Sequence, residues 1–471
     1  MVFSEFSEQI GPRTFPHPRN HPTTQPPRFL VPQRLNDRFR PSPLSAVASS
    51  LARAPPLLDA RSPTPYSPRE TGTRCEAPVK DFLNAPYRVD ENRYRRFDEK
   101  YIGFARVLWD ETYKGYGKPI NQGAPARVRR NVPGCSRVDY ALQTASWTLY
   151  DTYPGAFSRE RIGDMQGSEG PVQRTEDPLT EALGPHPVED PASMASQVKR
   201  AAQVFGACAA GVTRVNPDWL YAKRLSGEPG DLPEGVDTAV VMLIEMDDFG
   251  LAASPAVAGA VATGNGYSRM AFATACLAEF IRNLGFRAIA SGNDTAISVP
   301  LAVDAGLGEF GRNGLLIHPV FGQRVRICKV FTDLPLATDR PIEFGAKRFC
   351  MTCMRCAKHC PSKSISFDRE PTWESPHDTP SNNPGVLKWY VNVDSCYAFW
   401  TANTADCSNC VRVCPYTKNP GWIHAVPRFF IHRLPWFNRF WLLADTLLGY
   451  GKQTDPEAFW TQDRYLGKKR Y

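Results

Sequence analysis

The sequence predicts an α+β protein that carries a small cysteine-rich module near its C-terminus. Between residues 190 and 345, helical apolar patterns alternate with short β-branched runs, as expected for helices packed on a sheet. Between residues 346 and 420, eight cysteines fall into two closely spaced runs. The chain has 471 residues, of which 42% are hydrophobic and 22% are charged, and this is enough for two or three globular domains.

The part of the chain before residue 190 divides by composition. Residues 1–75 are rich in Pro, Arg, Ser and Thr, and we expect them to be disordered because they cannot bury enough apolar surface. Residues 76–190 are expected to pack on the core, with one helix predicted over residues 138–153. The net charge of +8 is modest and comes largely from Arg-rich terminal segments, so it does not indicate a nucleic-acid partner.

The regular elements lie in a predicted domain over residues 191–345. Asp190 is placed to cap a helix that begins at residue 191. A longer helix is predicted over residues 267–285, with Gly285 at its C-terminal end. A short helix is predicted over residues 300–307, and the predicted strands cover residues 209–215, 239–245, 287–290, 314–317 and 325–330.

A glycine-rich stretch follows the short helix. Residues 306–311 read GLGEFG, which matches the G-x-G-x-x-G pattern of dinucleotide-binding folds. That fingerprint requires a strand before it and a helix after it. Here the helix comes first and a strand follows, so we do not expect a dinucleotide site. The glycines instead suit a tight turn or a close approach of the backbone to another cofactor.

The two cysteine runs predict a pair of iron–sulfur clusters. The first run has the spacing C-x2-C-x2-C-x3-C followed by Pro361, and the second has C-x10-C-x2-C-x3-C followed by Pro415. In bacterial two-cluster ferredoxins, three cysteines of one run bind one [4Fe–4S] cluster and the fourth binds the other cluster. We therefore expect one cluster on Cys350, Cys353, Cys356 and Cys414, and the other on Cys396, Cys407, Cys410 and Cys360.

Zinc sites and disulfides are the alternatives for these cysteines, and the spacing favours clusters over both. Thirteen cysteines, most of them in cluster spacing, also indicate a compartment in which thiols stay reduced. Among the other five, Cys276 and Cys328 have apolar neighbours and are expected to be small buried residues.

Residues 421–471 form a tail that is rich in Trp and Phe. The tail could pack back on the main domain, or it could form an interfacial helix or a partner surface, since Arg and His residues interleave with the aromatic ones. The chain has no uncharged apolar run of about 18 residues, so no transmembrane helix is expected. The N-terminus has no charged segment followed by an apolar one, so no export signal is expected.

Several separated motifs resemble the reductive dehalogenases, a family of cobalamin-dependent iron–sulfur enzymes. They are ATGNGYSRM at residues 262–270, SGNDT at 291–295, AGLGEFGRNG at 305–314, RVRICKVFTDLP at 324–335 and SNNPGVLKWYVN at 381–392. Both cysteine runs follow in the family's order. The resemblance covers roughly residues 135–425 and is specific, because several independent motifs occur in one order.

This resemblance implies a nitroreductase-like α+β domain that binds base-off cobalamin, followed by a ferredoxin module whose two [4Fe–4S] clusters supply electrons. It implies an enzyme that replaces the halogen of a small organohalide with hydrogen. Tyr267 matches the family's proton donor, and Asn293 and Arg326 match its polar and basic neighbours. A phenol holds its proton at neutral pH, and a guanidinium, which keeps its own proton, favours the tyrosinate that remains.

Two segments are expected to contact the corrin, around residues 308–314 and 381–390. No D-x-H-x-x-G motif for a histidine ligand to cobalt is present, which fits the family's base-off binding. Trp389 and Tyr390 could also wall a substrate pocket or belong to the core. The candidate cofactor contacts are Gly308, Gly311, Asn313, Gly314, Asn383, Lys388, Trp389 and Tyr390.

Two other functions remain open on the sequence. Epoxyqueuosine reductases, which act on transfer RNA, share the cobalamin domain and the two-cluster module, but the motifs around Tyr267 and residues 381–392 favour the dehalogenases. A non-catalytic electron carrier would need no large domain before its clusters. We expect a cytoplasmic enzyme that takes electrons from an external ferredoxin or flavodoxin, and whose tail can contact a membrane surface.

Overall fold

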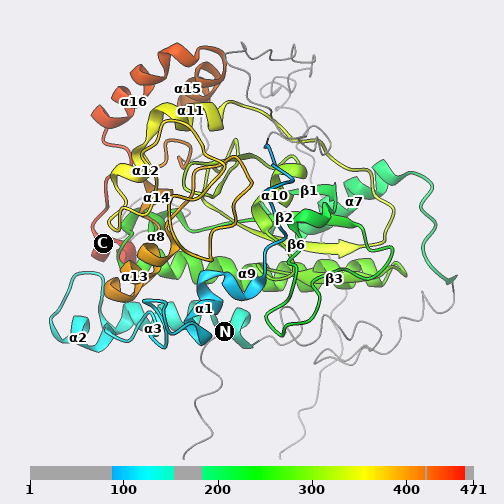
Figure 1. The fold of residues 1–471 in the computed structure, drawn as a ribbon, viewed down its shortest axis with the longest axis horizontal. Helices are drawn as coiled ribbons and strands as arrows, with labels where there is room; N and C mark the ends of the chain where they lie inside the picture. The colour runs from blue at the N-terminus through cyan, green and yellow to red at the C-terminus, as the bar shows by residue number, and fades with distance from the viewer. Residues whose placement is uncertain (1–86, 153–182, 419–421, 462–471) are drawn as a thin grey trace, which may run out of the picture. The chain divides into compact units, whose positions relative to one another are not determined.

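The computed structural model describes residues 87–152, 183–418 and 422–461. These residues belong to one compact unit that extends from Glu76 to the C-terminus (Figure 1). The segment predicted to be disordered, residues 1–75, lies outside the described residues. The domain boundaries at residues 190, 345 and 420 stay predictions.

An antiparallel four-stranded sheet forms the centre of this unit, in the order β1-β2-β6-β3. β2 is buried along nearly its whole length, as expected of an inner strand that is covered on both faces. The α+β prediction is therefore confirmed, and each of the four strands lies close to its predicted range. They are β1 (Ala209–Arg214), β2 (Thr238–Glu245), β3 (Ala288–Ser291) and β6 (Val325–Thr332).

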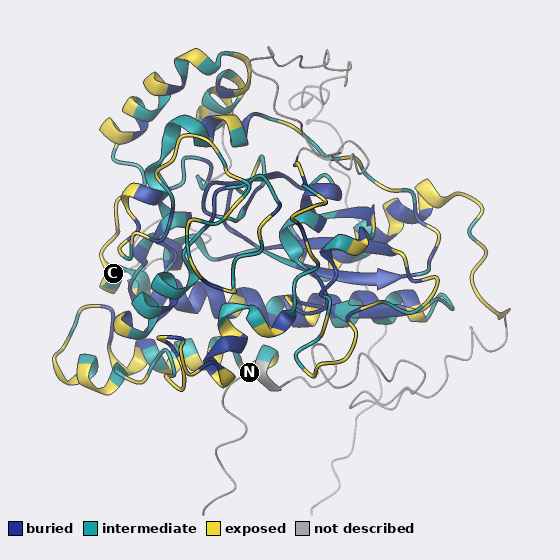
Figure 2. Ribbon diagram, viewed as in Figure 1, coloured by how far each residue is buried: buried dark blue, intermediate teal, exposed yellow. Residues whose placement is uncertain are grey.

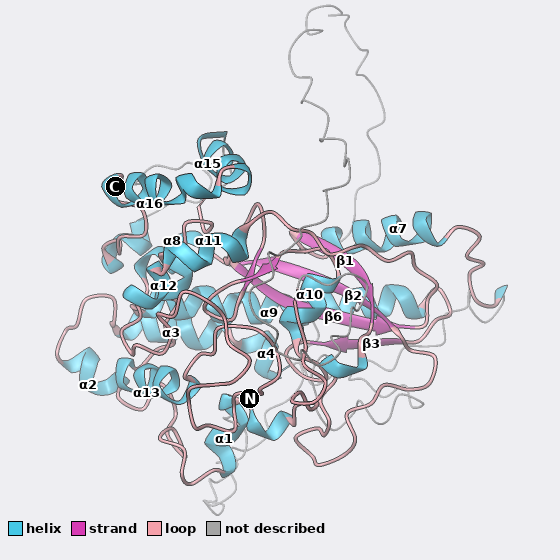
Figure 3. Ribbon diagram, turned by 45° about the horizontal axis from the view of Figure 1, so that its top comes forward, coloured by secondary structure: helices cyan, strands magenta, loops and turns pink. Residues whose placement is uncertain are grey.

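Helices cover both faces of the sheet (Figure 3). α7 (Pro191–Val204) and α9 (Val257–Arg282) pack on the face that carries Met242, and α10 (Ser298–Asp304) packs on the face that carries Leu243. Successive residues of β2 thus belong to two separate apolar cores, because strand side chains alternate between faces. As predicted, the Asp190 carboxylate caps α7 by accepting bonds from the first backbone N–H groups of the helix.

The single helix predicted over residues 138–153 is wrong. The structure has two helices there, α3 (Arg137–Ser146) and α4 (Thr148–Thr152), which meet at Trp147. The hydroxyl of Ser268, on α9, donates a hydrogen bond of 2.7 Å to the carbonyl oxygen of Ser146. A tertiary contact therefore takes up a carbonyl that a continuous helix would use, and residues 138–153 give no local signal of it.

The helix α9 begins ten residues before its predicted start at residue 267 and ends at Arg282, just before the predicted end. The glycines before Tyr267 lie inside the helix, where they allow close packing. A Cβ on Gly264 would lie only 2.3 Å from the Ser146 hydroxyl and 2.5 Å from the Trp147 indole nitrogen. Cys328, on β6, is fully buried as predicted, whereas Cys276, on α9, is only half-buried because it lies on the outer side of the helix.

The GLGEFG stretch contains β4 (Glu309–Phe310), which forms a hairpin with β5 (Leu316–Ile317). No helix follows it directly, which agrees with the expectation that it is not a dinucleotide fingerprint. The strand predicted from residue 314 starts two residues later, because Gly314 adopts a φ of 78° in the turn before β5.

Short helices occur in the cysteine-rich module, in the region before the sheet and between elements of the sheet domain. In the module they are α11 (Ala346–Cys353), α12 (Arg355–Lys358), α13 (Val393–Asn403) and α14 (Asn409–Arg412). The remaining ones are η1 (Glu99–Tyr101), α1 (Gly103–Trp109), α2 (Ala124–Arg129), η2 (Pro217–Trp219) and α8 (Asp248–Ala253).

The aromatic tail forms α15 (Trp422–Arg433), η3 (Pro435–Phe437), α16 (Asn438–Leu447) and η4 (Pro456–Thr461). Ile431 is buried against α11, so part of the tail packs back on the module. Much of α16 is nevertheless exposed (Figure 2). Large apolar side chains remain at the surface, namely Ile423, Val426, Phe429, Trp436, Phe440, Leu443, Leu447 and Leu448. Within the described residues, no helix is both long and apolar enough to cross a bilayer.

Candidate active site and cysteine sets

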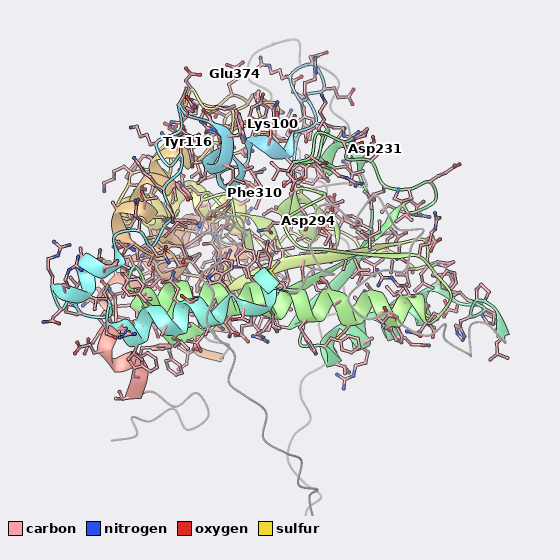
Figure 4. All side chains as sticks on the ribbon, turned by 90° about the horizontal axis from the view of Figure 1, so that it is seen from below. Lys100, Tyr116, Asp231, Asp294, Phe310 and Glu374 are labelled. Atoms are coloured by element: carbon pink, nitrogen blue, oxygen red, sulfur yellow. The ribbon has the colours of Figure 1, made fainter. Side chains whose placement is uncertain are left out.

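Three residues that are far apart in the sequence meet at one side of the sheet. Tyr267 comes from the middle of α9, Arg326 from β6, and Asn293 from the loop after β3. The amide nitrogen of Asn293 donates a 2.6 Å hydrogen bond to the Tyr267 phenol oxygen. The Arg326 guanidinium carbon lies 4.9 Å from the centroid of the Tyr267 ring. In Figure 4, α9 runs across the view, and the labelled Asp294 is the residue that follows Asn293 in the sequence.

Two further aromatic residues enclose the tyrosine. The Trp147 ring stacks on the Tyr267 ring with centroids 4.8 Å apart, and the Tyr150 ring meets it edge-on at 4.9 Å. Trp147 lies at the break between α3 and α4, and Tyr150 lies in α4. The sequence reasoning missed them, because that segment was expected to form one helix in a region that packs on the core, and it carries no motif of its own.

Arg326 is anchored behind the tyrosine. One of its terminal nitrogens donates a 3.1 Å bond to the Thr263 hydroxyl. The buried Asp406 interacts with the same hydroxyl and with the guanidinium charge. Burial raises the pKa of Asp406, while Thr263 and Arg326 oppose the shift. Since Asp406 precedes Cys407, the polar site is linked directly to the cysteine-rich module.

The eight cysteines of the module fall into two sets in space. Cys350, Cys353 and Cys414, with Cys356, line one small cavity that is closed by Phe349 and Tyr416. Cys396, Cys407 and Cys410 interact electrostatically with one another and with Cys360, the fourth cysteine of the first run. The structure thus brings each predicted ligand set together, including the exchange of the fourth cysteine between runs.

The chemistry of these thiols suits a cationic cluster. Burial raises the pKa of Cys350 to about 12 and that of Cys414 to about 11, so the thiols stay protonated without a positive partner. Within the described residues, no three Cys, His, Asp or Glu side chains converge on a position for one metal ion. A [4Fe–4S] cluster needs a wider set, because each thiolate binds a different iron.

Around both sets, donors and loop geometry support the thiols. The Cys360 sulfur accepts a 3.3 Å bond from the backbone N–H of Ser364, and the Ser362 hydroxyl lies 3.3 Å away. Arg312 is almost fully buried and donates a 2.9 Å bond to the Cys350 carbonyl. Met354 adopts a φ of 51°, which turns the chain sharply between α11 and α12 and lets the first run curl around its cavity.

A cavity of about 370 Å³ lies between α10, the β4–β5 hairpin and residues 381–393. Gly308 and Gly311 are not among its lining residues, and they instead pack against the backbone of Ile317 and Leu315. Tyr267 does not line the cavity either, although Ile297, four residues after Asn293, does. The other predicted corrin contacts do line it, namely Asn313, Gly314, Asn383, Lys388, Trp389 and Tyr390.

The cavity is lined by aromatic side chains and by two lysines, Lys347 and Lys388. Lys388 is half-buried, lies 4.8 Å from the Tyr390 ring centroid and has no ammonium hydrogen-bond partner among the described residues. Burial lowers the pKa of Lys388 to about 8, and burial also lowers the pKa of Lys347. The predicted residues Trp389 and Tyr390 use their polar atoms in bonds to backbone carbonyls, so their rings are fixed in place.

One wall of the cavity holds a buried carboxyl group. Tyr87 and Trp219, which line the cavity, each donate a hydrogen bond to the Asp304 carboxylate, at 2.7 and 3.1 Å. Burial nevertheless raises the pKa of Asp304 to about 7. Sequence reasoning missed these three residues, since they come from three segments that show no common pattern.

Two four-cysteine sets beside an α+β domain define the class of iron–sulfur oxidoreductases. Comparison with known proteins identifies the family within this class. A family described as 4Fe-4S dicluster domain matches residues 349–418. A tetrachloroethene reductive dehalogenase from Desulfitobacterium hafniense is 33% identical over 400 residues, covering 71% of this chain and 72% of that protein. Another from Sulfurospirillum multivorans is 32% identical over 397 residues, covering 77% and 78%. The chain belongs to the reductive dehalogenase family.

Solved structures agree on the fold. A reductive dehalogenase described with a mechanism for B12-dependent dehalogenation has a TM-score of 0.60 and 22% identity, covering 81% of this chain and 50% of that one. The catabolic dehalogenase NpRdhA, in complex with 3-bromo-4-hydroxybenzoic acid, has a TM-score of 0.59 over 80% and 49%. This chain thus spans about half the length of both. An epoxyqueuosine reductase from Lactococcus garvieae is a more distant relative, 28% identical over 122 residues.

Proposed function

We propose that this protein removes halide from a small organohalide and replaces it with hydrogen, using base-off cobalamin and two [4Fe–4S] clusters. The observation that carries the proposal is the meeting of Tyr267 with Asn293 and Arg326 in a member of this family. Three separate elements deliver a proton donor, an amide and a fixed positive charge to one place, which is what proton transfer to a reacting carbon requires.

The large cavity suits the cofactor. A corrinoid combines an apolar macrocycle, a fringe of amides and an anionic phosphate, and the cavity offers aromatic walls, Asn313, Asn383 and the Lys388 ammonium. We assign these residues to cofactor binding, with the sheet and its helices as a nitroreductase-like domain. When bound, the cobalamin supplies a low-valent cobalt that breaks the carbon–halogen bond.

Tyr267 then acts as the proton donor. Because the Asn293 amide donates to the phenol oxygen, the phenol's own hydrogen is left to point toward a substrate. The Arg326 charge beside the ring stabilises the tyrosinate after the proton has left. Trp147 and Tyr150 exclude water from two sides of the ring, which strengthens both interactions.

Electrons enter through the two cysteine sets. The proposed ligands are the two groups of four given above, with Cys360 and Cys414 exchanged between runs. An external ferredoxin or flavodoxin of low potential is the proposed donor. Two electrons and one proton balance the replacement of a carbon–halogen bond by a carbon–hydrogen bond with release of halide.

A membrane surface is the proposed partner of the tail. α15 and α16 expose a set of large apolar side chains, and the charged side chains exposed on these two helices are basic, Arg433 and Arg439. The acid Asp445 is buried and paired with Arg355 and Lys418. Such a surface suits the headgroup region of a bilayer that contains anionic lipids.

The decisive experiment reconstitutes the protein anaerobically with iron, sulfide and cobalamin and measures halide release from a panel of aryl and alkenyl halides. Tyr267→Phe should keep clusters and cobalamin but lose turnover by about 100-fold or more. Tyr116→Phe, an exposed tyrosine on a surface turn, is the matched control and should keep full activity. Full activity in Tyr267→Phe would remove the proton-donor assignment, and a loaded protein that releases no halide from any compound would refute the function.

A further inference from the structure

A fully buried lysine lies on β6, three residues after Arg326. Lys329 has no exposed surface, and it pairs with Ser291, the last residue of β3. Cys328 and Val330 face α9, whereas Val325 and Phe331 face α10. Because strand side chains alternate, Lys329 points to the α10 side, which is the face opposite Tyr267. Its role therefore does not come from contact with the phenol.

The lysine donates its hydrogen bonds to the loop that follows β3. Its ammonium donates to the carbonyl of Gly292, to the carbonyl of Ala296 at 3.1 Å and to the hydroxyl of Ser298 at 3.0 Å. A lysine has three N–H donors, so all of them are used here. The three acceptors lie on both sides of Asn293 in the chain, and the loop is thus fixed at its two ends.

Other contacts also hold the backbone of this loop in place. The Asp294 carboxylate accepts a 2.7 Å bond from the Gly292 N–H, and the Tyr221 hydroxyl donates a 3.1 Å bond to the Asn293 carbonyl. Thr295 adopts a φ of 69°, which is unfavourable for a β-branched residue and needs support from its surroundings. With its backbone held, Asn293 projects its amide to the Tyr267 oxygen.

Burying an ammonium here costs free energy, because the charge loses its hydration. Burial lowers the pKa of Lys329 to about 8, and the negative charge of Asp294 opposes the shift. The hydrogen bonds that the ammonium donates to the loop offset part of this cost. The polar group with a proposed function that lies on this loop is the Asn293 amide.

We infer that Lys329 is a positioning residue, which holds the loop of residues 292–298 so that Asn293 donates its hydrogen bond to the Tyr267 phenol. The inference rests on the proposed role of Tyr267. It differs from a purely structural role in one respect: the effect of Lys329 on the phenol must pass through Asn293.

The test is a double-mutant cycle in the reconstituted enzyme with 3-fluorotyrosine at position 267. Its ¹⁹F resonance reports the surroundings of the phenol independently of turnover. Lys329→Met should move the resonance toward its position in Asn293→Leu and lower kcat by about 10-fold with little change in KM. In the Asn293→Leu background, Lys329→Met should change neither quantity further, because the amide through which it acts is gone.

Lys114→Met, an exposed lysine far from the loop in the chain, is the control and should change nothing. If Lys329→Met does not fold, Tyr221→Phe and Ser298→Ala each remove one loop bond and should move the resonance in the same direction. Additive effects in the Asn293→Leu background, or an unmoved resonance in the single variants, would overturn the inference. If Tyr267→Phe keeps turnover, the proposed function fails, while the resonance still decides the role of Lys329.

Discussion

Tyr267 is held by side chains from three elements that lie far apart in the sequence. Trp147 stacks on its ring, the Arg326 charge lies beside it, and Asn293 fixes its oxygen. In the proposed proton transfer, a side chain restrained in this way would lose little further freedom, because its orientation is already present before substrate binds. The residues around it therefore serve geometry as much as electrostatics.

Asp304 gives a prediction about pH. Its raised pKa of about 7 means that the folded protein keeps this carboxyl protonated at pH values where the unfolded chain has lost the proton. Its contribution to stability is complete below about pH 4 and is lost as the pH rises through about 7. Asp304→Asn should therefore flatten the fall in unfolding free energy between pH 5 and 7, by up to about 1.4 kcal/mol per pH unit.

Urea unfolding at pH 5, 6 and 7 measures this slope. Asp378→Asn is the control, because Asp378 is exposed, and its slope should match that of the unmodified protein. An Asp304→Asn protein with an unchanged slope would show that the carboxyl is already ionised in the fold at pH 5.

Motifs in the sequence identified Tyr267, Asn293 and Arg326, and the structure brings them together. Trp147, Lys329 and Asp304 could not be found in this way. Their roles depend on contacts with segments more than 30 residues away in the chain, such as Trp147 with α9 or Asp304 with Tyr87. A single sequence shows residue types and local spacing, whereas these contacts arise only when the sheet and its helices pack.

At the level of elements, α9 depends on a glycine where α3 crosses it. Gly264→Ala would place a methyl group within 2.3 Å of the Ser146 hydroxyl and against Trp147. Overpacking costs about 1–3 kcal/mol, which exceeds the gain of about 1 kcal/mol from replacing glycine in a helix. We expect a lower thermal midpoint and a changed tryptophan fluorescence. Asn265→Ala, exposed on the same helix, should not lower the midpoint, and equal midpoints in both variants would contradict this packing.

The tail helices give a prediction about membranes. Trp436 is 75% exposed and Phe440 48%, so each can insert into a lipid surface without unfolding the tail. The double variant Trp436→Ser, Phe440→Ser should reduce cosedimentation with vesicles that contain anionic lipid by about 10-fold or more, and high salt should reduce it further. Phe367→Ser, an exposed aromatic outside the tail, is the control. Vesicle binding that is unchanged by the double variant would reject the tail as the contact.

At the level of the whole molecule, the two cysteine runs are tied together by more than sequence. Cys360 lies with the second set and Cys414 with the first, so each set needs both runs in place. This arrangement could be predicted from spacing alone, because the ferredoxin loop imposes it. The large cavity could be predicted only in part, since its walls come from separate segments that extend from Tyr87 to Val393.

If the two runs exchange their fourth cysteines, substitutions at two nearby cysteines should remove different iron–sulfur clusters. Cys353→Ala removes a proposed ligand of the set with Cys414, whereas Cys360→Ala, seven residues later, removes a proposed ligand of the set with Cys396. Each variant should lose about four irons per chain and a different electron paramagnetic resonance signal, because each cysteine belongs to a different cluster. Cys276→Ala, a half-buried cysteine on α9, should keep all the iron. If Cys353→Ala and Cys360→Ala abolish the same signal, the two runs do not exchange ligands.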